Sequence, residues 1–211
     1  MATPINPAAP STAKAPQRAW RVVDIVVASV IAVVSGVIFW AWNMSYAGLD
    51  FLWVAFPPSS GLVMGMWLFP GVLGALIIRK PGAALYCELL AAIVSAFMGS
   101  QWGLTVLMSG LVQGLGAEVV FASLRYRRWG LPAAMVAGGG MALFGTFNEL
   151  FIVNWFPMYT LPMKFAYMGF AIVSGVVIAG LVSWVATRAI ARTGALSSLA
   201  SRRAAQEPVA G

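Results

Sequence analysis

Long apolar stretches alternate with short polar or basic segments along most of this chain. Each stretch is close to the roughly 20 residues that a helix needs to cross the hydrocarbon core of a bilayer. The pattern therefore predicts an all-α integral membrane protein with six transmembrane helices, in the expected spans 22–43, 61–78, 83–98, 102–124, 131–156 and 163–186.

Prolines and polar residues mark where these spans begin and bend. Pro57 and Pro58, followed by two serines, predict a helix start before the second span, and Pro70 with Gly71 predicts a kink within it. The membrane domain is expected to cover residues 18–192. Residues 1–17 are rich in Pro, Ala, Ser and Thr, and we predict that they and residues 193–211 are disordered cytoplasmic tails.

Basic residues are distributed unevenly between the two sides of this six-span arrangement. Of the 13 Lys and Arg residues, all but Lys164 fall in the tails or in the connections after the second and fourth spans. These segments share one side of the predicted bundle, and cytoplasmic segments carry an excess of Lys and Arg. Both termini are therefore predicted to be cytoplasmic, and topology explains the net charge of +7 better than nucleic-acid binding does.

Composition excludes several classes of activity. The chain is 61% hydrophobic and 9% charged, contains no histidine and has a single cysteine, Cys87. Without histidine there is no HExxH zinc site, no His-based nucleophilic catalysis and no His-ligated haem. No lysine follows a glycine, so the chain lacks a Walker A loop and ATP would have to act on another chain. We therefore expect neither an enzyme nor a cofactor or metal.

Two acidic residues lie deep on the cytoplasmic side of neighbouring spans, where a carboxylate is costly unless a partner receives it. From a helix rise of about 1.5 Å per residue, Glu88 and Glu118 lie at the same level, roughly 10 to 12 Å from the inner edge. One interpretation is a structural polar pair that ties two spans together. The alternative is a pair of proton sites in a self-sufficient carrier for a small cationic or heterocyclic solute.

Glu149 lies nearer the outer surface, at a level rich in aromatic residues. The aromatics form either a belt that faces lipid or the walls of a box for a flat, cationic or amino-bearing heterocycle. In such a box the rings stack on the ligand and the carboxylate pairs with its charge. The candidate substrate-binding residues are Glu149, Asn148, Trp155, Tyr159, Trp40, Asn43, Trp53, Trp102, Gln101, Gln113 and Tyr167.

Small residues recur every four positions on the first span, at Ala28, Ala32 and Gly36. Such a stripe lets another helix approach closely. It packs either against the other spans of this chain or against a partner protein.

Three segments carry a resemblance to a known family: PGVLGALIIRKPGAALYCELLAA, GSQWGL and SGLVQGLGAEVVFASLRYRRW. With them, nearly all of residues 20–190 resembles the YkoE type of S component, the substrate-binding subunit of energy-coupling factor (ECF) vitamin transporters. Similar proteins are six-helix bundles that capture thiamine, or its hydroxymethylpyrimidine precursor, on the outer side of the membrane.

The resemblance implies partners and roles for features already described. It implies a transmembrane T component and two ABC-type ATPases, in the inner (cytoplasmic) membrane of a prokaryote. It assigns the stripe of Ala28, Ala32 and Gly36 to docking on the T component. It also makes the connection 44–60 the outer loop that covers the substrate, and the missing Walker motif fits ATPases on separate chains.

The predicted topology is tested by a reporter fused after Gly211. Because the positive-inside rule puts the C-terminus in the cytoplasm, a fused green fluorescent protein should fluoresce and a fused alkaline phosphatase should be inactive. The opposite pair of results would exclude the six-span arrangement.

Overall fold

The computed structural model describes residues 19–210, which form helices and turns without any strand. The expected tail 1–17 lies outside these residues. The elements are α1 (Val22–Ala47), α2 (Asp50–Trp53), the 3₁₀ helix η1 (Pro57–Trp67), α3 (Phe69–Ile78), α4 (Ala83–Phe97), α5 (Thr105–Ser123), α6 (Leu131–Phe147), the π-helix η2 (Asn148–Ile152), α7 (Leu161–Ser174), the π-helix η3 (Gly175–Val182) and α8 (Ser183–Arg192).

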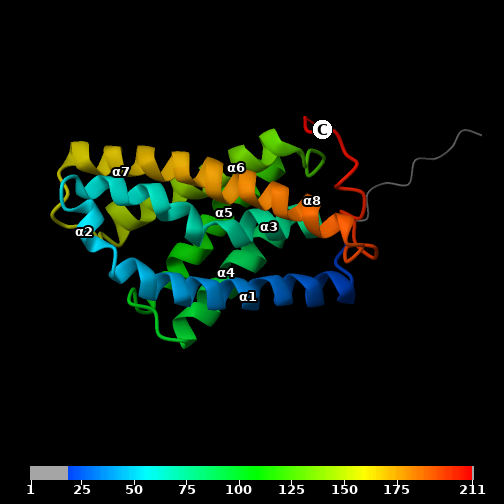
Figure 1. Cartoon of the computed structure of the whole chain (residues 1–211), viewed down its shortest axis with the longest axis horizontal. Coiled ribbons are helices and arrows are strands. Elements are labelled where there is room, and N and C mark those ends of the chain that lie inside the picture. Colours follow the sequence, from blue (N-terminus) through cyan, green and yellow to red (C-terminus); the bar gives the residue numbers. More distant parts are fainter. Residues whose placement is uncertain (1–18, 211) are drawn as a thin grey trace, which may run out of the picture.

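The helices form one elongated bundle. α1 runs along one side, and the continuous helix formed by α7, η3 and α8 runs along the opposite side (Figure 1). α4 packs between α1 and α5, α5 packs against α6, and α6 packs against η3. The start of α1 and the C-terminal segment lie at the same end of the molecule (Figure 1). A chain that crosses the membrane an even number of times, as the sequence predicts, has both ends on the same side.

Within residues 19–210, five helical segments are long and apolar enough to cross a membrane: Val22–Ala47, Pro57–Ile78, Thr105–Ser123, Leu131–Ile152 and Leu161–Arg192. The segment Ala83–Phe97 is also apolar but has only 15 residues. Each predicted span corresponds to one of these six segments. The second span differs most, because it begins at Pro57 and changes from 3₁₀ to α-helix at Leu68, two residues before the predicted kink at Pro70.

Glycines bring several helices into backbone contact. Gly138 of α6 faces Gly175 at the start of η3. A Cβ atom added to Gly116 of α5 would lie only 2.6 Å from the carbonyl oxygen of Gly140 in α6. Because lipid tails are as apolar as the helix surfaces, the hydrophobic effect does not drive helices together inside a membrane. Close packing of this kind stabilises their association instead. These contacts fix α6 firmly between its two neighbours.

The small-residue stripe of α1 lies inside the bundle, against α4. Ala28 and Ala32 are fully buried, and a Cβ atom added to Gly36 would lie 2.5 Å from the Val94 Cβ atom. The exposed side of α1 instead carries β-branched residues: Val22, Ile25, Val26, Val30, Val33, Val34, Val37 and Ile38. The stripe therefore packs internally in this conformation, which is one of its two expected roles, and docking on a T component stays a prediction.

The two deep carboxylates bind helix starts rather than each other. Glu88 of α4 accepts a hydrogen bond from the Gly71 backbone N–H in the first turn of α3, at 2.9 Å. Glu118 of α5 accepts one from the Ala84 backbone N–H in the first turn of α4, at 2.8 Å, and another from the Tyr126 hydroxyl. Because no hydrogen bond joins the two carboxylates among the described residues, the predicted Glu88 and Glu118 pair is wrong.

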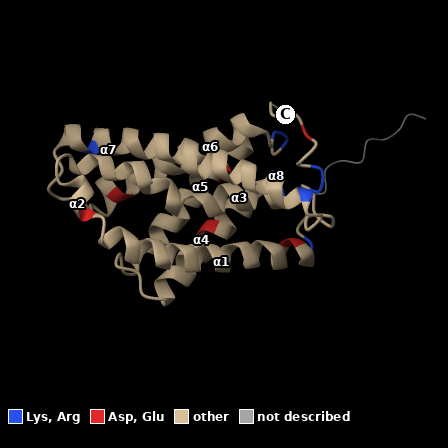
Figure 2. Ribbon diagram, in the orientation of Figure 1, with Lys and Arg blue, Asp and Glu red and all other residues tan. Residues whose placement is uncertain are grey.

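Lys and Arg residues gather at one end of the bundle (Figure 2). There, ionic contacts connect the start of α1 to the turn before α4. Asp24 accepts a hydrogen bond from Arg21 at 2.8 Å and forms an ion pair with it. The Lys80 ammonium group binds the same carboxylate, and both partners of this second pair are buried.

The C-terminal segment folds back over this end, although the sequence predicts disorder for residues 193–211. Leu196 and Leu199 are buried, and the Ser201 hydroxyl donates to the Ile77 carbonyl oxygen at the end of α3. Arg79 binds Glu207 with two hydrogen bonds, at 2.6 and 2.7 Å. The segment is polar in composition but has these specific partners, so the predicted disorder is wrong for residues 193–210.

A pair of glycine substitutions tests the close packing of α6. Gly138→Ala should destabilise the protein by about 1–3 kcal/mol, because the new methyl group meets the Gly175 carbonyl and the helices must separate. Gly169→Ala is the control, since nothing lies within 4 Å of its added Cβ atom and alanine favours helix. Thermal unfolding in detergent measures both. Equal unfolding midpoints would contradict the packing described.

Candidate functional site: an aromatic cavity with one carboxylate

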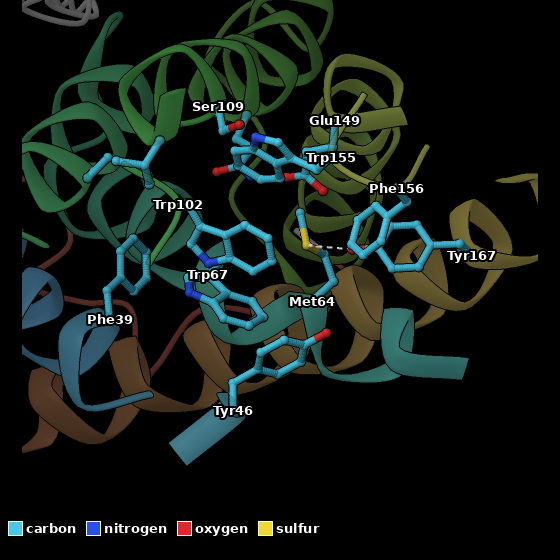
Figure 3. A pocket seen from close by; sticks show the side chains of 13 residues that line it. Phe39, Tyr46, Met64, Trp67, Trp102, Ser109, Glu149, Trp155, Phe156 and Tyr167 are labelled. Carbon is cyan, nitrogen blue, oxygen red and sulfur yellow. Dashed lines mark hydrogen bonds between the residues drawn. The ribbon is translucent and has the colours of Figure 1, made fainter. Parts of the chain in front are cut away.

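A cavity lies toward the end of the bundle opposite the basic residues. Figure 3 shows the side chains that line it. The space between its lining side chains is about 490 Å³, counting the open space at its mouth. Side chains from α1, η1, α4, α5, η2 and α7 and from two connections line it: Phe39, Tyr46, Met64, Trp67, Ala92, Trp102, Val106, Ser109, Gln113, Glu149, Trp155, Phe156 and Tyr167.

Glu149 is the acidic residue of this lining. It is 2% exposed, and its Oε1 atom accepts a hydrogen bond from Gln113 Nε2 at 3.1 Å. The Tyr167 hydroxyl lies beside the same carboxylate and 3.8 Å from the Met64 sulfur (Figure 3). A carboxylate held by an amide and a phenol is oriented before any ligand arrives.

The π-helix η2 explains how two neighbouring polar residues, Asn148 and Glu149, are both buried. In η2 the Val153 backbone N–H donates to the Asn148 carbonyl five residues earlier, at 2.8 Å. The wider turn presents Glu149 to the cavity while Asn148 Nδ2 donates to Ser109 Oγ at 3.1 Å. Short π-helical turns within α-helices occur frequently at functional sites.

One face of α5 forms the wall opposite Glu149. Val106, Ser109 and Gln113 are three and four residues apart, so they share a helical face. The sequence prediction included Gln113 but missed Ser109 and Val106. Helical spacing from Gln113 is the signal that identifies both.

Aromatic rings form most of the remaining wall. Trp102 and Trp155 stack with ring centroids 4.7 Å apart and planes 24° apart. Tyr46 meets Trp67 edge-on at 5.1 Å. The prediction missed these lining residues of the apolar helices and of the connection after η2: Phe39, Tyr46, Met64, Trp67, Ala92 and Phe156.

Five of the predicted binding residues line the cavity: Glu149, Gln113, Trp102, Trp155 and Tyr167. Three others lie behind the wall. Asn148 binds Ser109, Asn43 Oδ1 accepts a hydrogen bond from Trp67 Nε1 at 2.9 Å, and the Tyr159 ring stacks on Phe156.

The structure does not place the last three predicted residues, Trp40, Trp53 and Gln101, in the lining. Gln101 is exposed in the turn before α5. The prediction assigned all three by depth alone, and depth does not determine which way a side chain faces.

Lys164, the basic residue predicted on the outer side, holds the connection that carries Trp155 and Phe156. Its ammonium group donates to the carbonyl oxygen of Leu150, within η2, at 2.7 Å, and to Asn154 Oδ1 at 3.2 Å. Asn154 adopts a left-handed backbone conformation with φ of 54°, which asparagine tolerates better than most residues. Lys164 therefore positions the turn that presents Trp155 to the cavity.

The groups that line the cavity suit the binding of a ligand. It offers a carboxylate, an amide, hydroxyl groups and several aromatic faces. Among residues 19–210, no group of three or more His, Cys, Asp or Glu side chains is arranged to hold a metal ion. An aromatic box with one carboxylate suits a flat ligand that carries positive charge or amino groups.

Comparisons with known proteins agree with this description. A family model described as the permease component of an ABC-type cobalt transport system matches residues 23–144. YkoE of Bacillus subtilis (strain 168), whose name proposes an HMP/thiamine permease, is 35% identical over 186 residues, which are 87% of this chain and 90% of YkoE. The crystal structure of an S-component of an ECF transporter shares 32% identity at a TM-score of 0.80, covering 89% of this chain and 94% of that chain.

The chain belongs to the YkoE-type S components of ECF transporters. The family predicted from the sequence is therefore confirmed, and with it the helical membrane fold. An S component is a transport subunit and not an enzyme, which agrees with the binding character of the cavity. Belonging to this family also implies that the S component works with a T component and ATPases.

Substitution of Lys164 tests its control of the connection after η2. Lys164→Met should speed amide hydrogen exchange at Val153 and Trp155 by about tenfold, because the loss of a charged hydrogen bond costs roughly 1.5 kcal/mol or more locally. Lys164→Arg, which keeps the charge and donors, is the matched control. Unchanged exchange in Lys164→Met would show that the connection is held by other contacts.

Proposed function

We propose that this S component captures thiamine, or its hydroxymethylpyrimidine precursor, in the aromatic cavity and supplies it to an ATP-driven importer. The observation that carries the proposal is the buried Glu149 carboxylate facing a cavity walled by aromatic rings. The similarity to YkoE, named for HMP/thiamine permeation, supports the same substrate class.

The chemistry of this substrate class suits the cavity. An aminopyrimidine is flat and carries N–H donors, which a carboxylate accepts, while tryptophan faces stack on the ring. Thiamine adds a cationic thiazolium, which aromatic faces attract and a carboxylate neutralises. Gln113 already donates to Glu149, so its carbonyl oxygen remains as an acceptor for a ligand N–H.

Capture from outside follows from the placement of charge. The cavity lies at the end of the bundle opposite the basic residues, and the positive-inside rule puts the basic end in the cytoplasm of a prokaryotic cell (Figure 2). The chain has no Walker A sequence, so ATP would be hydrolysed by two ABC-type ATPases that act through the T component. Release to the cytoplasm then requires that complex.

The family description that names cobalt suggests a metal as a second substrate class. The cavity chemistry disfavours it. Cobalt sites in proteins use several imidazole, thiolate or carboxylate ligands, and this lining offers one carboxylate and no histidine. An organic cation fits the aromatic wall better than a hydrated metal ion does.

The alternative of a self-sufficient proton-coupled carrier has weaker support. It required Glu88 and Glu118 as proton sites, but each carboxylate accepts a hydrogen bond from a different helix start and neither lines the cavity. Both groups thereby hold helices together through at least one carboxylate oxygen. Uptake of thiamine by the isolated chain in liposomes would favour the carrier.

Thermal unfolding with ligand tests the proposal. A ligand that binds only the folded state at 100 times its Kd stabilises it by about 2.7 kcal/mol, so thiamine or hydroxymethylpyrimidine should raise the unfolding midpoint. Glu149→Gln keeps the shape but removes the charge, and it should weaken thiamine binding by roughly 10- to 100-fold.

The matched control is Asp50→Asn, the same chemical change at an exposed position outside the cavity. It should leave the affinity for thiamine within twofold of wild type. No stabilisation of folded wild-type protein by either compound would exclude the substrate assignment, and equal losses in both variants would exclude the role of Glu149.

A further inference from the structure

A second cavity lies at the basic end of the bundle, far from the aromatic cavity. Its volume is about 830 Å³, counting the space at its mouth. The ends of α1, α3 and α5 and the C-terminal segment contribute to its lining. Lys and Arg residues gather at this end of the molecule (Figure 2). Nothing in the capture of a substrate at the opposite end explains a cavity here.

The charge of this second cavity is strongly positive. Four cationic side chains line it, at Arg21, Arg79, Lys80 and Arg202, and none of its lining residues is acidic. Asp24 neutralises part of the charge through Arg21 and Lys80, and Glu207 does so through Arg79. Four cations against two carboxylates leave two positive charges. Within the described residues Arg202 has no hydrogen-bonding or ionic partner for its guanidinium.

The C-terminal segment holds these cations in place. Arg21 Nη2 donates to the Ser198 carbonyl oxygen at 2.9 Å, and Ser201, next to Arg202, donates to Ile77 at 2.6 Å. Leu199 is 1% exposed between these two contacts. Arg202 is therefore carried by an anchored part of the chain, and an anion that binds there does not have to order a free tail.

Aromatic residues place the cavity at the level of a membrane surface. Trp129 lines it and stacks on Phe121 of α5 with ring centroids 4.9 Å apart. The Arg79 guanidinium lies 5.9 Å from the Trp129 ring centre. Tryptophan is enriched where hydrocarbon meets lipid headgroups, and basic pockets between helices on the cytoplasmic side suit acidic headgroups.

We infer that this cavity binds a phosphate-bearing anion, with the headgroup of an acidic phospholipid as the expected source and free inorganic phosphate as the second. The guanidinium of Arg202 supplies a planar fork of donors that matches phosphate oxygens, and the net positive charge of the lining supplies the attraction. The anion would bridge Arg202 on the C-terminal segment and the cations at the helix ends. The inference does not depend on which vitamin the aromatic cavity binds.

The test uses the full-length protein in a neutral detergent, together with variants at two adjacent arginines. Native mass spectrometry measures binding of dioctanoyl-phosphatidylglycerol and dioctanoyl-phosphatidylcholine, and thermal unfolding measures the effect of inorganic phosphate. Arg202→Gln should weaken phosphatidylglycerol binding about fivefold, the change that corresponds to about 1 kcal/mol per basic residue near the surface. Arg203→Gln is the matched control, because Arg203 is also exposed but does not line the cavity.

The expected result is a preference for phosphatidylglycerol over phosphatidylcholine that depends on Arg202 and not on Arg203. Stabilisation by inorganic phosphate with the same dependence, and no preference between the lipids, also supports the site and assigns it to soluble phosphate. Two results would overturn the inference: equal losses of phosphatidylglycerol binding in both variants, or binding of both anions that is unchanged by Arg202→Gln. Unfolding midpoints without ligand check that both variants fold as the wild type does.

Discussion

Backbone N–H groups at helix starts inside a membrane must find partners within the protein, and this constraint organises the bundle. α3 begins in mid-bundle at Phe69, and α4 begins after the turn at Gly82, neither with a capping side chain of its own. Glu88 and Glu118 supply the missing acceptors from the next helix in sequence. Each carboxylate also meets the positive end of a helix dipole, which stabilises its charge. α3, α4 and α5 are thereby held in register.

This fixed centre separates two ends with opposite chemistry. At one end aromatic rings and a single carboxylate surround a cavity, and at the other end cations and the C-terminal segment surround another. Lys164 is the basic residue of the aromatic end, and it is used to cap η2. An S component that takes a cationic or amino-bearing ligand from outside and meets its partners inside requires such an asymmetry.

Hydrophobic periodicity and charge predicted the helices, because both depend on runs of many residues, whereas the resemblance of three segments predicted the family. The cavity depends on rotation about each helix axis, which periodicity does not reveal where nearly every position is apolar, as in η1. Glu149 was predicted because a polar residue in an apolar run is informative by itself. Trp67 and Phe39 were missed since nothing distinguishes them from aromatics that face lipid. The partners of Glu88 and Glu118 were missed because they are backbone N–H groups, which nearly every residue has and which a sequence therefore does not distinguish.

Some cavity residues lie on packed helices and others lie on the connections between helices, and this difference bears on how a ligand enters. Gln113 lies against Gly145, where an added Cβ atom would be 2.7 Å from its side chain, so the polar floor of Gln113 and Glu149 is fixed by helix packing. Trp102 and Trp155 lie on connections and stack on each other at 4.7 Å. A flat ligand must exchange this ring contact for its own. For the proposed ligand we therefore expect the floor to set charge selectivity and the connections to set the rates of entry and release.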